Sequence, residues 1–395
     1  MNDLYSSAKA QLPALVELRR WFHRHPELSM QEVQTAQRIE QELDQLGITH
    51  TRVGKTGVLG VIRGNQPGSH VIALRADIDA LPIQETASVP YCSQTDGVMH
   101  ACGHDAHTTC LLGAAKLLSE AQDLFGGEVR LIFQPGEEIG QGAEDFISAG
   151  ALKGVERVFG LHTAHEIPAG TVSITPGINN AAVDQFRIVI QGKAAHVSTP
   201  QLGADAVYIG SLIVNAVQAL VTRRSSPVEP VLVGIGSFHA GTTYNALADS
   251  AVLEGTTRTI TKEMRQQLRR DIDTLCQQTA QLYGGTAEVQ WTGICSALWN
   301  DAQVCREAVN ALTKLLPDVT FRQDRPLSLA GDNFAELNQT IPGAYAYLGS
   351  GNPDRPNTLN PAHNGNFNLD EDTLAIGAAL YAGYAKGWLN KEVAP

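Results

Sequence analysis

The sequence predicts a two-domain α/β protein in which a small βαββαβ domain is inserted into a larger α/β domain. Three observations support this. The 395 residues exceed what one compact core usually holds. Helical and strand patterns alternate through the first part of the chain, and the pattern changes near residue 181 and returns near residue 295. We therefore expect the larger domain at 1–180 and 295–395, and the inserted domain at 181–294.

The larger domain is expected to alternate helices with short apolar strands, because helical spacing and β-rich runs follow one another. In order, the predicted elements are helices at 8–25 and 30–46, strands at 57–63 and 70–79, a helix at 106–121, strands at 127–138 and 157–165, and a closing helix at 373–389. Polar residues follow several of these strands, so we expect functional side chains at the strand ends.

The inserted segment has a different order of elements. From residue 181 the patterns indicate a strand, a long helix, two strands, a long amphipathic helix and a last strand. This βαββαβ order over roughly 110 residues is the split βαβ unit of ferredoxin-like domains.

Composition excludes several classes of protein. The net charge of −12 argues against nucleic acid or an anionic membrane surface as the main partner. No run of 18 apolar residues occurs, and the first residues lack the apolar core of a secretory leader, so we expect neither a membrane span nor secretion. The cysteines are irregularly spaced, which favours reduced thiols in a cytoplasm over a disulfide framework: Cys92, Cys102, Cys110, Cys276, Cys295 and Cys305.

The stretch "MHACGHDAHTTCLL" concentrates metal-binding residue types in eight positions: His100, Cys102, His104 and His107. Cys102 and His104 would point the same way on extended chain, and Asp105 is a good N-cap for the helix that follows. Thiolate and imidazole both bind Zn²⁺ and similar ions. A cysteine nucleophile or a buried turn remains open from this stretch alone.

The stretch "FQPGEEIGQGA" places Glu137 and Glu138 after an apolar strand and a Pro-Gly break. Adjacent carboxylates outside a helix point in different directions. One can therefore bind a metal while the other acts as a general base. Taken alone, the pair also fits a solvated loop.

Further candidates lie at other strand ends and in one loop. His162 ends a predicted strand, and His363 lies in a loop before the closing helix. Asp77 and Asp79 follow another strand and could orient a metal-bound histidine, although they could also cap a loop. Five residues from four segments exceed one tetrahedral site and suit two ions: Cys102, His104, Glu138, His162 and His363.

The chain resembles the aminoacylase/carboxypeptidase metallohydrolases, and within them the branch of hippurate hydrolases and indole-acetyl-amino-acid amidohydrolases. The motifs "RRWFHRHPELSMQE", "ALRADIDALPI", "GVMHACGHDAHT", "FQPGEE" and "GLH" carry the resemblance over nearly the whole chain. It implies Glu137 as general base and proton shuttle. It implies the same five metal ligands: Cys102, His104, Glu138, His162 and His363.

The resemblance also assigns roles in the inserted domain, which it implies to be a dimerisation or lid domain. It places His196 where the family keeps a histidine that polarises the scissile carbonyl, often across a dimer. Asn245 and Arg258 match positions that hold the substrate carboxylate, and the planar fork of arginine suits that task.

The implied activity is metal-dependent hydrolysis of the amide bond of N-acyl amino acids. A dipeptidase or carboxypeptidase on the same metal site, or a cysteine-nucleophile hydrolase, is the alternative. The implied cofactors are two divalent ions per subunit, Zn²⁺ or Mn²⁺, with Co²⁺ or Ni²⁺ compatible. We expect a small-molecule substrate, a homodimer through the inserted domain, and no nucleic-acid or membrane partner.

Three positions depart from the family pattern. Ala248 replaces a usual proline, Asp332-Asn333 stands where Glu-Asp is usual, and Asn364-Gly365 replaces Ser-Pro after the last ligand. These departures leave the metal chemistry intact and bear on the identity of the substrate.

Overall fold

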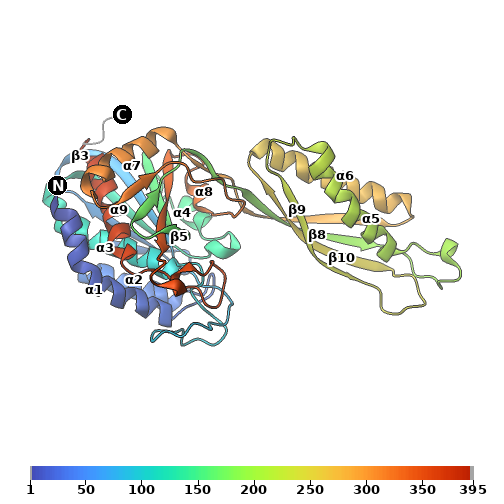
Figure 1. Cartoon of the computed structure of the whole chain (residues 1–395). Coiled ribbons are helices and arrows are strands. Elements are labelled where there is room, and N and C mark those ends of the chain that lie inside the picture. Colours follow the sequence, from blue (N-terminus) through green and yellow to red (C-terminus); the bar gives the residue numbers. More distant parts are fainter. Residues whose placement is uncertain (1, 392–395) are drawn as a thin grey trace. The chain divides into compact units, whose positions relative to one another are not determined.

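The computed structural model describes residues 2–391, which divide into two compact units (Figure 1). Unit 2 consists of Asn180–Leu298 and Leu327–Asp332, and unit 1 holds the rest. The predicted fold class, a mixed α/β protein with an inserted ferredoxin-like domain, is confirmed. Residues 327–332 differ from the predicted boundary and group with unit 2, because the N–H of Ala181 bonds to the carbonyl oxygens of Ser328 and Ala330.

Unit 1 is built on an eight-stranded mixed sheet with the order β1-β2-β4-β3-β5-β14-β6-β13. Its central strands β4, β3, β5 and β14 are parallel, and their near-continuous apolar sequences fit burial on both faces. The bounds are Thr49–Val53 (β1), Gly57–Arg63 (β2), Gln66–Asp77 (β3), Gly126–Gln134 (β4), Arg157–Pro168 (β5), Thr171–Ser173 (β6), Thr320–Arg322 (β13) and Gly343–Gly351 (β14). A separate two-stranded sheet pairs β7 (Gly177–Asn180) with β12 (Leu298–Asn300).

The helices of unit 1 form its core together with the eight-stranded sheet. They are Asn2–Arg24 (α1), Val33–Gln45 (α2), His104–Glu120 (α3), Ala143–Ser148 (α4), Ala302–Leu315 (α7), Phe334–Leu337 (α8) and Thr373–Leu389 (α9). Helices α1, α3 and α9 pack against one another. Both α3 and α9 are buried on almost every side.

Unit 2 follows the predicted βαββαβ order. Its elements are Ala182–Gln191 (β8), Ala206–Ala219 (α5), Leu232–Ala240 (β9), Ser250–Thr259 (β10), Lys262–Leu282 (α6) and Thr286–Cys295 (β11). The four strands are antiparallel in the order β11-β8-β10-β9, and both helices cover the same face of the sheet (Figure 1).

One helix among the described residues, Ala206–Arg224, is long and apolar enough to cross a membrane by length and composition alone. Its Ile209, Ile213 and Val217 are buried in the core of unit 2. Packing against the sheet therefore accounts for the apolar side chains on the buried face of this helix.

The close packing of α3 and α9 predicts the effect of a single methyl group. A Cβ added at Gly377 of α9 would lie 2.4 Å from Sγ of Cys110 on α3. We expect G377A to lower the free energy of unfolding by about 1–2 kcal/mol, because overpacking outweighs the gain in helix propensity. The urea midpoint measures this. G236A is the control, because its Cβ would meet nothing within 4 Å; equal midpoints for both variants would contradict the prediction.

Candidate metal centre

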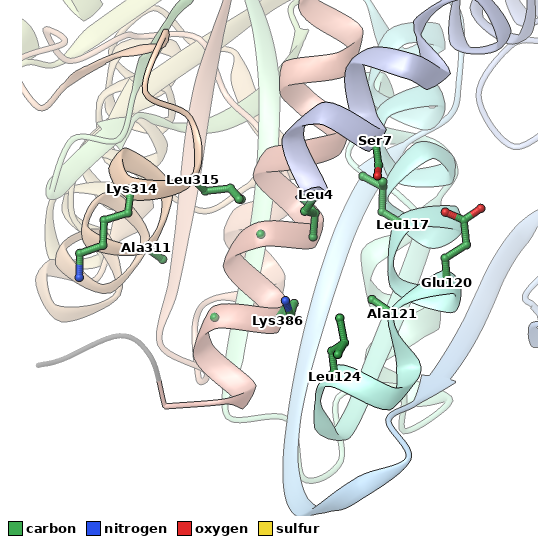
Figure 2. A pocket seen from close by; sticks show the side chains of 12 residues that line it. Leu4, Ser7, Leu117, Glu120, Ala121, Leu124, Ala311, Lys314, Leu315 and Lys386 are labelled. Carbon is green, nitrogen blue, oxygen red and sulfur yellow. The ribbon is translucent and has the colours of Figure 1, made fainter. Parts of the chain in front are cut away.

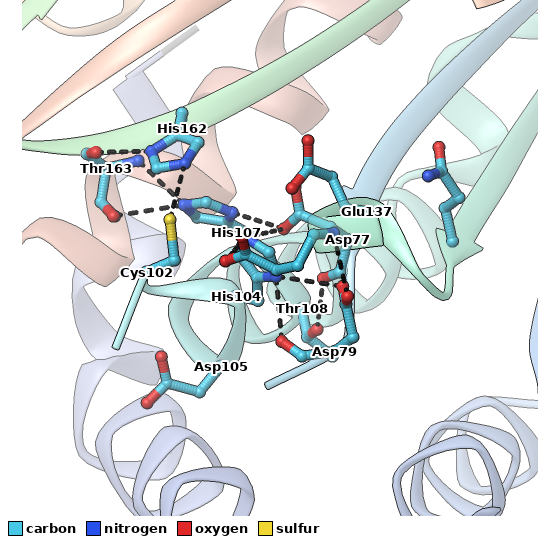
Figure 3. Close-up of polar contacts among 12 residues, drawn as sticks. Asp77, Asp79, Cys102, His104, Asp105, His107, Thr108, Glu137, His162 and Thr163 are labelled. Carbon is cyan, nitrogen blue, oxygen red and sulfur yellow. Dashed lines mark hydrogen bonds and ion pairs between the residues drawn. The ribbon is translucent and has the colours of Figure 1, made fainter. Parts of the chain in front are cut away.

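The candidate site lies at the carboxyl ends of the central strands of unit 1, where a parallel sheet gathers side chains from separate segments. Strand β3 ends at Asp77, and Asp79 follows two residues later. Strand β4 ends at Gln134 and leads into the short 3₁₀ turn Glu137–Ile139. The turn from β4 and the region around Asp77 and Asp79 therefore reach the same edge of the sheet (Figure 3).

The structure brings the five predicted metal ligands together. Sγ of Cys102 lies 3.4 Å from Nε2 of His162. Nε2 of His104 is 3.9 Å from Oε1 of Glu138, and Nε2 of His363 is 3.4 Å from Oε2 of the same carboxylate. Two triplets have ligand atoms within 4.8 Å of one another, Cys102–His104–His162 and Cys102–Glu138–His363.

Hydrogen bonds orient two of the imidazoles for metal binding. Nδ1 of His104 contacts the carbonyl oxygen of Asp79 at 2.9 Å, and Nδ1 of His162 contacts that of Thr163 at 2.7 Å. A carbonyl oxygen only accepts, so Nδ1 carries the proton in both rings and Nε2 offers its lone pair. Nε2 of His104 and Oε1 of Glu138 are buried without a hydrogen-bond partner, so these residues fit a bound cation.

His107 has a supporting role instead. Its Nε2 accepts the N–H of Thr163 at 2.9 Å, and its Nδ1 lies 2.6 Å from Oδ1 of Asp77. Both ring nitrogens are therefore engaged, and His107 joins β5 to Asp77. His100 is buried, and that burial lowers its pKa to about 4, so it is a neutral side chain. The predicted ligand set includes neither of these two histidines.

The electrostatics of the cluster show a site with excess negative charge. Burial lowers the pKa of His104, but the carboxylates of Asp77 and Asp79 outweigh it and raise that pKa well above its usual value. Burial, and the Glu138 carboxylate with it, raises the pKa of the Cys102 thiol. A thiol kept protonated is a poor nucleophile, so the surroundings of Cys102 disfavour the cysteine-hydrolase alternative. A bound cation would reverse this effect, because metal binding deprotonates a coordinating thiol.

The local backbone explains how Cys102 and His104 converge. The predicted N-cap, Asp105, is wrong: helix α3 begins at His104 and its N-cap is Gly103, with φ 93°. A Cβ at Gly103 would lie 2.3 Å from Oγ1 of Thr163, so only glycine fits this turn. Asp105 instead pairs with the buried Arg19, at 2.8 Å from its Nε. The predicted extended alternation therefore does not occur; a left-handed turn aims both side chains at the site.

The loop before α9 brings in the last ligand. His363 has φ 60°, a left-handed conformation that is uncommon for residues other than glycine. Its N–H donates to the carbonyl oxygen of Ala101 at 2.8 Å, which joins this loop to the segment of Cys102. Strain at a residue held in this way is typical of functional sites.

The turn that carries Glu137 is held by Glu32 and Gln134, to which the sequence had assigned no role, and by Asn333, which had been noted only as a departure from the family pattern. The carboxylate of Glu32 accepts the N–H of Gly136 at 2.9 Å, and the N–H of Asn333 donates to Oε1 of Glu137 at 3.3 Å. Gln134 bonds to the side chain of Asn333 at 2.7 Å. Glu32 lies in a quoted motif and Gln134 precedes the glutamate pair, but their contacts span long sequence distances that no local pattern reveals.

Three predicted site residues belong to unit 2. Nδ1 of His196 lies 2.7 Å from Oγ of Ser198, and the N–H of Val197 donates to the carbonyl oxygen of Asn245. Arg258 lies half-buried on β10, where burial lowers its pKa, and no carboxylate among the described residues forms an ion pair with it. Their assigned roles remain predictions.

A separate cavity of about 430 Å³ lies in unit 1 among the ends of α1, α3, α7 and α9 (Figure 2). Leucines line it, together with Lys314 and Lys386, and it contains none of the candidate ligands. The two lysines occupy the last turns of α7 and α9, where a cation offsets the helix dipole. This cavity therefore has no part in the site chemistry described above.

A family comparison identifies this arrangement. The model of peptidase family M20/M25/M40 matches residues 73–387, which include the whole ligand cluster. The chain belongs to this family. The protein is a hydrolase of amide bonds and uses divalent metal ions, as the family match and the ligand cluster together indicate.

Members of the M20 family resemble the chain over almost its full length. An N-acetylcysteine deacetylase of Bacillus subtilis is 38% identical over 376 residues, covering 95% of this chain and 96% of the relative. An indole-acetyl-amino-acid hydrolase of Arabidopsis thaliana is 35% identical, covering 95% of this chain and 86% of the relative.

Solved structures show the same likeness. A dinuclear metal-binding peptidase of the M20 family from B. subtilis has a TM-score of 0.83 at 36% identity, covering 97% of this chain and 99% of its own. An aminohydrolase structure from methicillin-resistant Staphylococcus aureus has a TM-score of 0.92 at 34% identity, covering 98% and 100%.

The contact between His104 and Asp79 predicts a loss of metal affinity. Oδ1 of the Asp79 carboxylate lies 3.2 Å from Nδ1 of His104, beside the contact to the backbone carbonyl oxygen. We expect D79N to weaken metal binding by about 10- to 100-fold, because the negative charge that supports the His104 ring is lost while the backbone contact remains. Competition with a chelator measures the affinity. S29A is the control, since it removes the hydroxyl that donates to Asp79 at 2.7 Å and leaves His104 alone. A D79N affinity equal to that of S29A would contradict this role.

Proposed function

We propose that the protein hydrolyses the amide bond of N-acyl amino acids, releasing a carboxylic acid and a free amino acid. The observation that carries the proposal is the ligand cluster with the Glu137 carboxylate beside it: an oxygen of Glu137 belongs to one tight group with His104 and Glu138. The activities named for the deacetylase and the plant hydrolase support it. The related carboxypeptidase of Saccharolobus solfataricus, 38% identical over 386 residues, keeps peptide hydrolysis as the second candidate.

The proposed metal ligands are Cys102, His104, Glu138, His162 and His363. One thiol, three imidazoles and one carboxylate suit two ions of borderline character, and we propose Zn²⁺ or Mn²⁺, with Co²⁺ or Ni²⁺ as compatible alternatives. When bound, such ions lower the pKa of a coordinated water and polarise a carbonyl group. Asp77 and Asp79 would then hold the histidine rings from behind.

Glu137 is the proposed general base and proton shuttle. The left-handed Gly136, with φ 67°, begins the turn that separates this carboxylate from the ligand Glu138. Glu137 takes the proton of the attacking water and delivers it to the leaving amine, so one carboxylate serves both halves of the reaction.

Unit 2 is proposed to supply residues that bind the substrate. His196 would donate a hydrogen bond to the oxyanion that develops on the scissile carbonyl. Arg258 and Asn245 would hold the substrate carboxylate; in support, Arg258 forms no ion pair with a carboxylate of residues 2–391. A homodimer through unit 2, in the cytoplasm, belongs to the same proposal. The exposed apolar side chains of Val207 and Tyr208 on α5 favour such a contact.

The departures from the family pattern bear on the acyl pocket and its supports. Gly365 approaches another loop closely, because its carbonyl oxygen accepts the N–H of Thr86 at 2.7 Å and a Cβ would lie 2.6 Å from the oxygen of Gln84. Proline at this place, as in the usual Ser-Pro, would clash with that loop. We therefore propose that the chain accepts an acyl group different from those of relatives with Ser-Pro.

The substrate class is tested with a panel of N-acyl amino acids and dipeptides, assayed after chelation and after reloading with each of the four metals. We expect chelation to abolish hydrolysis and N-acyl amino acids to be the better substrates. Full activity after exhaustive metal removal would refute a metal-dependent mechanism, and a preference for dipeptides would establish the second candidate.

Replacing the proposed base separates catalysis from metal binding. We expect E137Q to retain its metal and to lose about 10²- to 10⁴-fold in kcat, because the amide cannot accept the proton. E144Q is the matched control, since Glu144 is exposed and its carboxylate accepts a hydrogen bond from the hydroxyl of Ser148. Near-normal turnover of metal-loaded E137Q would show that another group is the base.

Removing the proposed carboxylate anchor tests unit 2. We expect R258A to raise KM about 10- to 100-fold for substrates with a free carboxylate, because a charge-assisted contact is lost. Substrates with an amidated carboxyl group should be affected little. R187A is the control, because Arg187 lies exposed on the same sheet and pairs with Glu254. Equal effects on both substrate types would contradict the assignment.

A further inference from the structure

The buried side chain of Asn333 forms a hydrogen-bond junction beneath Glu137. Its backbone N–H donates to Oε1 of Glu137 at 3.3 Å. Its Oδ1 accepts from Nη2 of Arg75 at 2.9 Å and from Nε2 of Gln134 at 2.7 Å. Its Nδ2 donates to the carbonyl oxygen of Gln141 at 2.8 Å.

These contacts span both ends of the loop that carries Glu137. Gln134 ends strand β4 before the loop, and Gln141 follows the 3₁₀ turn after it. Asn333 is 1% exposed and both polar atoms of its side chain are bonded, so the direction of its N–H is fixed relative to this loop. An asparagine is suited to this place because it offers an acceptor and a donor on one side chain.

We propose that Asn333 is a positioning residue that sets the orientation of the Glu137 carboxylate and thereby the rate of proton transfer. The inference rests on the proposed role of Glu137 as the base. A general base must lie within hydrogen-bond reach of its proton, and small displacements cost large factors in rate. The N–H of Asn333 donates to Oε1 of Glu137 and so restricts the orientation of this carboxylate.

Asn333 also stands where the chain passes from one unit to the other. Residues 327–332 group with unit 2, and Asn333 is the first residue to rejoin unit 1. Its three side-chain contacts anchor the returning chain at this point. The hydrogen bond to Glu137 therefore comes from the residue at which the chain returns to unit 1. The catalytic rate should be sensitive to the contacts that hold this residue.

The first test compares N333A with wild type in metal-loaded enzyme. We expect kcat to fall about 10- to 100-fold while KM and metal content stay within threefold, because ligands and substrate contacts are untouched. N338A is the matched control: Asn338 is the C-cap of α8, the short helix whose N-cap is Asn333, and its side chain donates to the carbonyl oxygen of Trp299. A kcat of N333A within twofold of wild type, or a loss shared with N338A, would overturn the proposal.

A double-mutant cycle with E137Q shows whether Asn333 acts through Glu137. If it does, N333A should lower the residual rate of E137Q by less than twofold, because the group it positions is already gone. An equal loss in both backgrounds would overturn the proposal. A highly active E137Q would instead refute the base assignment, which keeps the two failures distinguishable.

N333S covers the case in which N333A does not fold. Serine keeps a hydroxyl in the buried junction but is too short to bond to Arg75, Gln134 and Gln141 together. We expect a loss in kcat of about threefold to tenfold, with unchanged KM, and no further loss in the E137Q background. A fully active N333S, or a loss that persists without Glu137, would overturn the proposal.

Discussion

The site of this protein depends on one buried cation, the guanidinium of Arg75. The side chain is inaccessible to solvent and lies on β3 beneath the ligand cluster. It donates to Oδ2 of Asp77 at 2.6 Å, to Gln134 at 3.0 Å and to Asn333 at 2.9 Å. A buried charge is tolerated only when it is paired and fully hydrogen-bonded, so each partner is held firmly. Through these three partners a single cation supports both the metal ligands and the base.

The geometry of the ligands is set by residues that need not touch the metal. Asp79 orients His104, the carbonyl oxygen of Thr163 orients His162, and His107 joins the two regions through Asp77. Such partners select the tautomer and the direction of each ring. The cluster is therefore organised before any ion binds, which reduces the ordering cost of binding.

Much of the fold could be predicted because its signals are local. The strand Gly57–Arg63 and the helix Thr373–Leu389 have the predicted bounds, since their apolar patterns end at clear breaks. The βαββαβ order of unit 2 could also be predicted from the hydrophobic periodicity of the sequence. The five candidate ligands, which the structure brings together, could be singled out because Cys, His and Glu are concentrated in a few short stretches, most of them near strand ends.

The remainder depends on contacts between distant segments. Asp105 looked like a helix cap, but a left-handed Gly103 takes that place and Asp105 pairs with Arg19. Asn333 lies 196 residues after Glu137 in the sequence, and no local sequence pattern predicts the hydrogen bond between them. The grouping of residues 327–332 with unit 2 could not be predicted from the sequence either, because two backbone hydrogen bonds hold this segment and they require no particular side chains.

The insertion of unit 2 into the sequence of unit 1 has a consequence for protein synthesis. Strand β14 and helix α9 are central to unit 1, yet they come from the last part of the chain, after the segment Asn180–Leu298. On the ribosome, the first 179 residues must wait with an open sheet edge beside β5 while the inserted segment emerges. Unpaired sheet edges invite aggregation. Chains that terminate early should therefore burden the chaperone and protease systems of the cell more than point variants of the finished protein.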